Sequence, residues 1–242
     1  MTLVQTIEPA AARSDGLTVA VVGATGAVGS EVIGCLESRG FPVGELRPLA
    51  SPRSAGRALP FRGGEVTVQA LGPDSFAGVD VAIFASSSGV SREYVPVAAR
   101  HGALVVDNSS AFRMDEGMPL VVPEVNGALL QDRPQVVANP NCVAAIAVMA
   151  LQPIHARNPI VRVIGSTYQS ASGAGAAAMA ELRESTAAAL AGRDYAPQVL
   201  PHPYAFNLFS HNAAVDLDSG YNGEEQKAME EIRKIMAAPD LR

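Results

Sequence analysis

Residues 17–29 read Leu-Thr-Val-Ala-Val-Val-Gly-Ala-Thr-Gly-Ala-Val-Gly, and this stretch decides the fold. Its first six residues form a continuous apolar run, which is typical of a strand buried on both faces of a parallel sheet. A helical pattern follows the glycines over residues 30–37. Strand, glycine turn and helix in this order predict the opening of a dinucleotide-binding Rossmann domain. The expected cofactor-binding residues of the turn are Gly23, Thr25, Gly26, Ala27, Val28 and Gly29.

The second strand is expected at residues 46–50, and its end bears on the choice of cofactor. An NAD-specific site usually has Asp or Glu at this end, whereas Glu45 lies at the wrong end of the strand. The strand is followed instead by Ser51, Arg53 and Ser54. An arginine flanked by hydroxyls suits a 2′-phosphate through charge-assisted hydrogen bonds. The segment favours NADP, with a solvated basic loop as the alternative.

Further apolar runs continue the pattern of a sheet. Strands are expected at residues 66–68, 79–85, 103–106 and 134–138, with a helix from Tyr94 to His101. A long β pattern covers residues 160–169, and helices are expected at 176–191 and from Gly223 onward. Cys35 lies inside the first helix beside apolar neighbours, so we expect it to be a core residue.

Composition excludes several classes of protein. The chain has 242 residues, 48% of them hydrophobic, enough for one large or two modest domains. A net charge of −6 provides no global basic field for nucleic acid, and no apolar stretch is long enough to span a bilayer. The two cysteines are far apart and the N-terminus has no signal-peptide core, which predicts a cytoplasmic protein without disulfides. No residues are assigned to a metal.

Residues 139–142, Asn-Pro-Asn-Cys, form the second decisive stretch. They separate a short apolar strand from an alanine-rich helical run that is expected to stop at Pro153. Cys142 should therefore lie in the first helical turn, where unpaired N–H groups and the helix dipole favour a thiolate. Cys142 is the candidate nucleophile. A small buried structural cysteine is the alternative, but such a cysteine would not need an Asn-Pro-Asn turn before it.

The Asn-Pro-Asn-Cys segment resembles the nucleophile segment of the aspartate-semialdehyde dehydrogenase family. Other stretches resemble the same family in the same order, over roughly residues 17–235. They include the Ser-x-Arg-Ser segment at Arg53 and Ser166-Thr167-Tyr168-Gln169. The resemblance implies an α/β fold: a Rossmann-type parallel sheet domain followed by an α+β catalytic and dimerisation domain of the glyceraldehyde-3-phosphate-dehydrogenase-like type. The expected ranges are a disordered lead-in at 1–16, the NADP-binding domain at 17–141 and the second domain, truncated, at 142–242.

The resemblance also implies the activity and the remaining site residues. The reaction is the reversible, NADP-dependent reductive dephosphorylation of aspartyl phosphate to aspartate semialdehyde through a cysteine thioester, on the pathway to lysine, threonine and methionine. Its small-molecule partners are aspartate semialdehyde and phosphate, and the complete enzyme is a homodimer. Ser172 and Gly173 are expected beside the nicotinamide. The substrate-binding residues implied are Arg113, Gln169, Glu224 and Lys227, although Glu224 and Lys227 could also be a surface ion pair.

A general acid–base is needed, and the four histidines do not have the context that the family gives its catalytic histidine. His155 lies roughly 20 Å along the helix from Cys142, His101 ends a helix, and His202 and His211 lie in loops. The chain stops at Arg242, before the family's histidine segment would begin. The expectation is an amino-terminal portion that binds NADP but is inactive or weakly active.

Two alternatives stay open at this point. One is a non-catalytic NADP-binding or subunit-partner protein derived from the enzyme, which the retained Cys142, Gln169 and Arg113 argue against. The other is N-acetyl-glutamyl-phosphate reductase, which shares the fold and the chemistry. The Asn-Pro-Asn context before Cys142 speaks against that reductase.

Overall fold

The computed structural model describes residues 16–211 and 213–242, and the chain divides into two compact units. Unit 1 is Met1–Val163 together with Met229–Arg242, and unit 2 is Ile164–Ala228. The predicted lead-in at residues 1–16 lies outside the described residues except for Gly16. The helix that starts at Cys142 belongs to unit 1. The predicted domain division at residues 141 and 142 stays a prediction.

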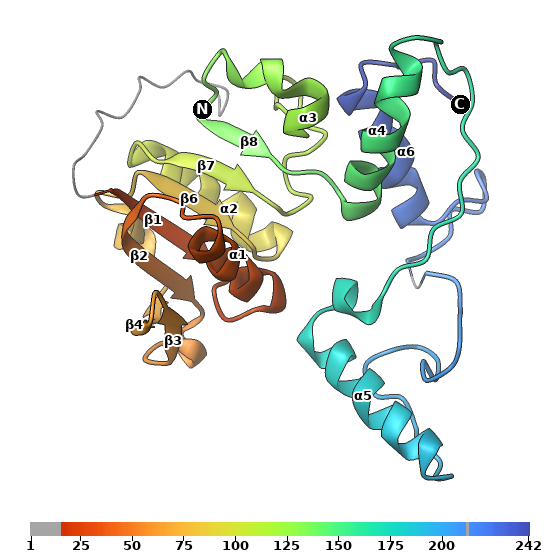
Figure 1. Ribbon diagram of the computed structural model, residues 1–242, viewed down its shortest axis with the longest axis horizontal. Helices are drawn as coiled ribbons and strands as arrows, with labels where there is room; N and C mark the ends of the chain where they lie inside the picture. Colours follow the sequence, from red (N-terminus) through yellow and green to blue (C-terminus); the bar gives the residue numbers. More distant parts are fainter. Residues whose placement is uncertain (1–15, 212) are drawn as a thin grey trace. The chain divides into compact units, whose positions relative to one another are not determined.

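Unit 1 is built on a six-stranded parallel sheet (Figure 1). Its strands are β1 (Leu17–Val22), β2 (Val43–Ala50), β5 (Gln69–Ala70), β6 (Val81–Phe84), β7 (Leu104–Asp107) and β8 (Val136–Ala138). Their order across the sheet is β5-β2-β1-β6-β7-β8. This is the order of a Rossmann fold, with the reversal of direction between β1 and β6, so the predicted fold class is confirmed. A separate antiparallel hairpin is formed by β3 (Ala58–Phe61) and β4 (Gly64–Thr67).

Helices cover both faces of the sheet, namely α1 (Ala27–Ser38) on one and α2 (Ser88–Arg100) on the other. Successive β1 side chains point to opposite faces. Val21 packs in a cluster with Ile33 of α1, whereas Val22 packs in the larger cluster with Val95 of α2. Strands buried on both faces need the continuous apolar runs that the sequence shows.

Two further helices complete the larger cluster of unit 1. They are α4 (Cys142–His155), through Ala144 and Val148, and the end of α6 (Gly223–Ile235), through Ile235. The remaining elements of the unit are short: α3 (Pro123–Asn126), η1 (Pro52–Ser54), η2 (Pro73–Phe76) and η3 (Gly127–Leu130). The burial of α4 and α6 against the sheet connects the candidate nucleophile to the Rossmann core.

Unit 2 contains η4 (Ala171–Ala174), α5 (Ala176–Leu190) and the first part of α6, and its described residues include no named strand. The predicted β segment at residues 160–169 is therefore wrong as regular structure. Near its start this segment bonds to the backbone of Arg242, whose N–H donates to Val161 O at 3.1 Å and whose O accepts from Val163 N at 2.6 Å. A β pattern forms a strand only where a partner strand supplies a ladder.

Two local predictions are corrected by the helices of unit 1. The α4 helix continues through Pro153 to His155, because Ala156 N still bonds to Gln152 O at 2.9 Å. A proline near a helix end removes only its own N–H bond. Cys35 is exposed rather than buried, since it lies roughly 200° around α1 from Ile33, which faces the sheet.

Candidate active site

The glycine turn after β1 brings the backbone against the strand end of β6. Gly23 has φ +84°, and a Cβ there would lie 2.3 Å from Ala85 O. Gly29, in the first turn of α1, is even more restricted, because a Cβ would lie 2.1 Å from Gly23 O. Only glycine fits these two positions without moving backbone. The turn thereby keeps the N-terminus of α1, with Ala27 and Val28, open toward the carboxyl edge of the sheet.

A cleft of about 330 Å³ lies directly over this turn. It is lined by Gly23, Thr25 and Gly26, with Ser51 from the end of β2 and Ser86 from the end of β6. The Ser86 Oγ is buried and has no hydrogen-bond partner among the described residues, so it is oriented for a polar ligand group. The location at the reversal of strand order is where such folds bind dinucleotides. The residues present therefore fit an NAD(P) cofactor.

Leu71, Val90 and Tyr94 give the same cleft an apolar wall that the sequence analysis did not identify. Burial and the neighbouring Glu93 carboxylate raise the pKa of Tyr94, so its hydroxyl stays neutral. Tyr94 also contacts the Phe76 ring, with ring centroids 6.5 Å apart. The sequence indicated only that Tyr94 lies on a helix, and nothing in its local context marked it as a cleft residue.

The corner predicted to hold a 2′-phosphate forms around η1. Ser51 precedes η1, Arg53 lies within it and is exposed, and Ser54 ends it. The Thr25 hydroxyl donates to Ser54 Oγ at 3.4 Å, which joins this corner to the glycine turn. An exposed guanidinium beside three hydroxyls is available to an anionic group. Of the predicted cofactor residues of unit 1, Gly23, Thr25, Gly26 and Ser51 line the cleft, and Ser54 is joined to them through Thr25.

Cys142 is the first residue of α4 and is exposed. Asn141 caps the helix, because its Oδ1 accepts from Val143 N at 2.8 Å. The preceding Asn139 bonds through its N–H to Asp107 O at 2.8 Å, and its side-chain amide donates to Asn108 Oδ1 at 2.6 Å. The turn is therefore anchored to the end of β7, and the thiol stands at the N-terminal, positive end of a 14-residue helix.

Arg113 lies under this turn and is only 8% exposed. Its Nε donates to Asn139 O at 2.9 Å and its Nη2 to Asn108 O at 2.9 Å. Its Nη1 pairs with the Glu231 Oε1 of α6 at 3.0 Å. Three protein acceptors thus use three of the five N–H groups of the guanidinium. The predicted substrate-binding residue Arg113 therefore lies next to the turn that precedes Cys142. It is largely buried, and three of its N–H groups already bond to protein acceptors.

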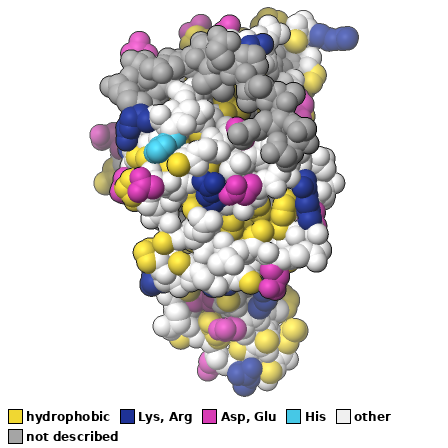
Figure 2. Space-filling view, turned by 90° about the vertical axis from the view of Figure 1, so that its left-hand side faces the viewer, with side chains coloured by type: hydrophobic (Ala, Val, Ile, Leu, Met, Phe, Trp, Pro, Cys, Tyr) yellow, Lys and Arg dark blue, Asp and Glu magenta, His cyan; other side chains and the backbone are white. Residues whose placement is uncertain are grey.

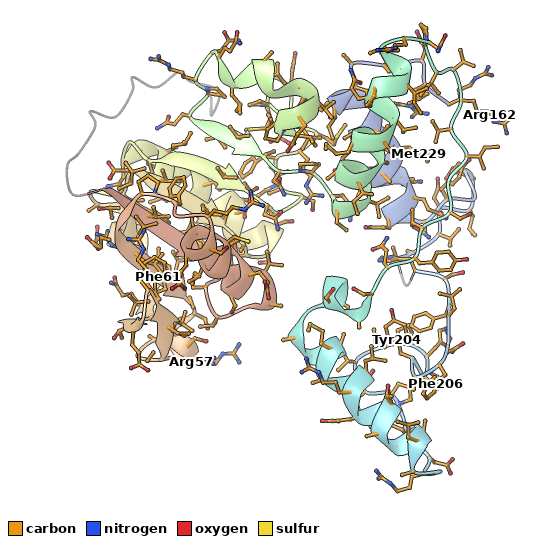
Figure 3. The ribbon with its side chains drawn as sticks, in the orientation of Figure 1. Arg57, Phe61, Arg162, Tyr204, Phe206 and Met229 are labelled. Atoms are coloured by element: carbon orange, nitrogen blue, oxygen red, sulfur yellow. The ribbon has the colours of Figure 1, made fainter. Side chains whose placement is uncertain are left out.

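Gln169, Ser172 and Gly173 belong to unit 2. The backbone oxygen of Gln169 accepts from the Tyr204 hydroxyl at 2.8 Å, and Tyr204 is labelled in Figure 3. Ser172 lies in η4, where its Oγ is 2.6 Å from Ser170 Oγ, and Gly173 follows it. The role of these three residues as substrate and nicotinamide contacts stays a prediction.

Glu224 and Lys227 lie at the start of α6, as expected. Asn222 caps this helix, with Oδ1 accepting from Glu224 N at 2.9 Å and from Glu225 N at 3.0 Å. Whether Glu224 and Lys227 bind substrate or form a surface ion pair stays a prediction. Their helical spacing places them on the face of α6 that also carries Glu231.

The two histidines of unit 1 are remote from Cys142. His155 is at the opposite end of α4, about 20 Å along the helix axis, and its Nδ1 accepts from Ile160 N at 3.1 Å. His101 ends α2, whose N-terminus is the end that faces the cleft. In unit 2, His202 packs against Phe209 with ring centroids 5.3 Å apart, and His211 Nδ1 accepts from Ala213 N at 3.1 Å. Neither histidine of unit 1 is within reach of the thiol.

Surface charge offers no large field of one sign on the face in Figure 2, where acidic and basic side chains are interspersed. Within residues 16–211 and 213–242, no cluster of three or more His, Cys, Asp or Glu side chains could hold a metal ion. None of the helices in this described part has the length and apolarity needed to cross a membrane.

Glu231 is the site residue that the sequence analysis missed. It is 1% exposed, and its Oε2 accepts from Asn141 N at 2.6 Å while its Oε1 pairs with Arg113. Its sequence context is a charged amphipathic helix, in which a glutamate ordinarily faces solvent. Only its helical spacing from Glu224 and Lys227 connected it to the predicted site.

Comparison with known proteins identifies both halves of the chain. Residues 18–133 match the family model "Semialdehyde dehydrogenase, NAD binding domain", and residues 151–242 match "Semialdehyde dehydrogenase, dimerisation domain". An aspartate-semialdehyde dehydrogenase of Synechocystis sp. is 45% identical over 226 residues, which cover 93% of this chain and 67% of that protein.

Solved structures agree with the family models. Aspartate semialdehyde dehydrogenase II of Vibrio cholerae, complexed with ASA, has a TM-score of 0.88 and 39% identity, over 93% of this chain and 68% of that one. An aspartate semialdehyde dehydrogenase with NADP from Candida albicans has a TM-score of 0.54 and 25% identity, over 60% of this chain and 49% of that one. The chain therefore spans about two thirds of the length of the Synechocystis relative.

Proposed function

Because the chain belongs to the aspartate-semialdehyde dehydrogenase family, we propose that it carries the NADP-binding site and the nucleophile for reductive dephosphorylation of aspartyl phosphate to aspartate semialdehyde. The observation that carries the proposal is the place of Cys142. It is exposed at the N-terminus of a helix, on the same sheet edge as the glycine turn.

The cofactor is held by the residues that line the cleft. Gly23, Gly26 and the first turn of α1 receive the pyrophosphate, and Ser86 supplies a hydroxyl without a partner among residues 16–211 and 213–242. Bound NADP accepts a hydride in the oxidative direction, and its reduced form supplies one in the biosynthetic direction. Leu71 and Tyr94 exclude water from one side of the cleft.

NADP rather than NAD is proposed from the chemistry of the η1 corner. Arg53 is exposed beside Ser51 and Ser54, and no carboxylate lies at the end of β2, which finishes at Ala50. Glu45 is engaged elsewhere, in a pair with Arg47 at 2.9 Å. A guanidinium with neighbouring hydroxyls recognises a phosphate, whereas a ribose 2′-hydroxyl needs an acceptor such as Asp or Glu. The solved Candida albicans relative is also one that contains NADP.

Cys142 performs the covalent step in this proposal. In the biosynthetic direction its sulfur attacks the acyl carbon of aspartyl phosphate, phosphate leaves, and a thioester forms. Hydride addition to the thioester carbon gives a hemithioacetal, and breaking its C–S bond releases the aldehyde and the same sulfur as thiolate. The N–H groups at the start of α4 and the helix dipole stabilise the negative sulfur in both steps.

The charged and polar groups of the substrate are assigned to Arg113, Gln169, Glu224 and Lys227. Three of the guanidinium N–H groups of Arg113 are used within the protein, which leaves two for a phosphate or carboxylate oxygen. Lys227 supplies a second positive charge, Gln169 an amide, and Glu224 an acceptor for the substrate amine. These assignments come from the family resemblance and the helical placement of Glu224 and Lys227 on α6.

The proton for the reacting oxygen has no donor near Cys142 among the histidines of unit 1. His101 and His155 stand at helix ends remote from the thiol. We therefore propose that the polypeptide Met1–Arg242, assayed alone, binds NADP but is inactive or turns over slowly. General acid–base catalysis contributes roughly 10²–10⁴-fold to such a rate.

A homodimer is proposed from the match to a dimerisation domain and from the surface of unit 2. Large apolar side chains of this unit are exposed, among them Ile164, Tyr168, Leu190, Phe206, Leu208 and Leu217. Exposed apolar surface of this extent marks a protein–protein interface. Sedimentation of the chain over a range of concentrations tests this, and a monomer at the highest concentration would contradict it.

The reaction is tested by incubating the chain with aspartate semialdehyde and NADP, with and without phosphate, and following NADPH absorbance over hours. Without phosphate, NADPH should stop at no more than one equivalent per chain, because the thioester cannot be released. With phosphate, formation should continue slowly. Cys142→Ser should abolish the signal, and Cys35→Ser is the matched control that should keep it. NADPH formation that persists in the Cys142→Ser variant would refute the assignment of Cys142 as the nucleophile.

A further inference from the structure

One buried carboxylate of unit 1 takes no part in the proposed reaction. Asp107 is the last residue of β7, and its side chain is fully buried. Its Oδ1 accepts from the Ser91 hydroxyl at 2.8 Å and from Ser109 N at 3.1 Å. Its Oδ2 accepts from the Ser109 hydroxyl at 2.8 Å. A carboxylate removed from solvent is stable only beside such donors, so these contacts fix its orientation.

The Ser109 hydroxyl extends this network into the loop of residues 108–113. Its single proton goes to Asp107, so its oxygen can accept from Ala111 N, at 3.0 Å. The carboxylate therefore fixes two backbone N–H groups of the loop. It bonds to one of them directly and to the other through the serine hydroxyl.

Two further contacts connect α2 to this region, and both lie at the surface. The exposed Ser110 hydroxyl is 3.0 Å from the Ser88 hydroxyl. Arg92 pairs with Asp115 at 3.5 Å, with side chains 58% and 44% exposed. Exposed contacts of this kind contribute little, because water competes for both partners. The buried carboxylate is therefore the main constraint on the loop.

The loop in turn supports the segment that precedes Cys142. β7 and β8 lie side by side in the sheet, so their ends meet at one edge (Figure 1). There Asp107 O accepts from Asn139 N at 2.8 Å, and Asn108 Oδ1 accepts from the Asn139 amide at 2.6 Å. Asn108 O also accepts from Arg113 Nη2 at 2.9 Å. Any shift of the loop therefore changes the anchoring of both Asn139 and Arg113.

We infer that Asp107 is a positioning residue for the nucleophile: its carboxylate fixes the loop from which Asn108 holds Asn139 and Arg113. The inference rests on the proposed role of Cys142. The carboxylate acts through the loop and not on the reacting atoms. An amide in its place would turn one acceptor oxygen into a donor that faces a serine group, and the loop would lose its fixed position.

The first test uses Cys35 as an internal reference for Cys142, since both are exposed cysteines of unit 1. Brief labelling with iodoacetamide gives the ratio of their rates in one sample. In Asp107→Asn the Cys142 to Cys35 ratio should fall about threefold or more, because the N–H groups at the start of α4 lose their constant orientation. Asp80→Asn is the matched control and should keep the ratio. Asp80 accepts from Thr18 N at 2.8 Å, but it precedes β6, at the opposite edge of the sheet.

A second variant, Ser109→Ala, keeps the test decisive if Asp107→Asn does not fold. It leaves the carboxylate in place and removes only the hydroxyl that links it to Ala111 N. Its ratio should fall in the same direction, whereas Ser110→Ala, at the exposed next position, should leave the ratio unchanged. An unchanged or higher ratio in the folded variants would overturn the inference and leave Asp107 a purely structural residue.

The second test follows amide hydrogen exchange in the same variants. The Asn139 N–H, whose acceptor Asp107 O is retained, should exchange about tenfold faster relative to the β1 amides. Faster exchange confined to residues 109–111 would overturn the inference, because the carboxylate would then fix only its own loop. A parallel rise in β1 would also contradict it. Exchange at Asn139 does not depend on the chemistry of Cys142, so failure of the proposed function is distinguishable from failure of this inference.

Discussion

Unit 1 and unit 2 are stabilised by different kinds of interaction. In unit 1, six parallel strands satisfy one another's backbone groups, and helices cover both faces with two apolar clusters. In unit 2, the described residues 164–211 and 213–228 include no named strand. In unit 2, side-chain acceptors bond to backbone N–H groups instead. Glu181 accepts from Gln198 N, Val199 N and Leu200 N, at 2.5, 2.7 and 2.8 Å.

This difference separates two kinds of site residue. The cofactor cleft, Arg113 and Cys142 are positioned by the sheet and by helices packed on it, so they are formed within one unit. Gln169, Ser172, Glu224 and Lys227 belong to a unit with exposed apolar side chains and few buried ones. Preorganisation of the site is therefore a property of unit 1.

The largest expected effect is on turnover. If unit 1 is preorganised for NADP and the nucleophile but neither of its own histidines reaches Cys142, Met1–Arg242 should bind NADP yet turn over roughly 10²–10⁴-fold more slowly than the Synechocystis relative. Parallel assays with aspartate semialdehyde, phosphate and NADP give the ratio, and NADP titration gives binding.

Equal turnover by the two proteins would mean that a histidine of this chain serves as the base. His211→Gln is then the first variant to make, with His155→Gln as its control, because His155 is already placed at the far end of α4. Loss of activity in the first variant alone would assign the base to unit 2.

The next effect concerns cofactor choice within unit 1. Arg53→Ala should weaken NADP binding about ten- to a hundredfold and leave NAD binding unchanged, since one charge-assisted contact to the 2′-phosphate is lost. Calorimetric titration of both dinucleotides measures this. Arg57→Ala is the matched control, because the Arg57 side chain extends away from the ribbon in Figure 3. Equal affinities of the unchanged protein for NADP and NAD would refute the assignment of Arg53.

A smaller effect distinguishes the two exposed cysteines of unit 1. Because both thiols are exposed, exposure does not predict which one reacts faster. Cys142 is the first residue of α4, whereas Cys35 lies in the last turn of α1. The helix dipole favours a thiolate at the first position and opposes one at the second. Brief alkylation with iodoacetamide at neutral pH, followed by peptide mapping, should label Cys142 about threefold faster or more. Faster labelling of Cys35 would show that the start of α4 does not activate its thiol.

The smallest effect is local to unit 2. Burial raises the pKa of the Glu181 carboxyl, but three backbone N–H donors outweigh it, and the net pKa lies below the ordinary value. The stability that the ionised Glu181 carboxylate adds to the folded state is therefore fully present above the ordinary glutamate pKa. It is lost as the pH falls through the lower, folded-state pKa. Glu181→Gln should lower the protection factors of the amides of residues 198–200 at neutral pH. Acidification should do the same in the unchanged protein, once the slower intrinsic exchange at low pH is allowed for. Exchange in β1 should not change, and Glu184→Gln, one turn along α5, is the control.

Much of unit 1 could be predicted from the sequence, because its signals are local. Three such signals are the apolar run of β1, the glycines at 23 and 29, and the Asn-Pro-Asn segment before α4. Each reflects a structural requirement at those residues themselves. A strand buried on both faces must be apolar throughout, a backbone contact closer than a Cβ allows must be glycine, and a helix start needs a cap. The order of the strands then follows from right-handed parallel connections.

What only the tertiary structure decided depends on partners far away in the chain. The β pattern at residues 160–169 forms no strand because a strand requires a neighbour, which no local pattern records. Cys35 is exposed because α1 turns Ile33, and not the cysteine, toward the sheet. Glu231 reads as an ordinary surface glutamate until folding brings it within 2.6 Å of Asn141 N and 3.0 Å of Arg113. A buried charge is stable only beside its partners, and these partners are 90 and 118 residues distant in sequence.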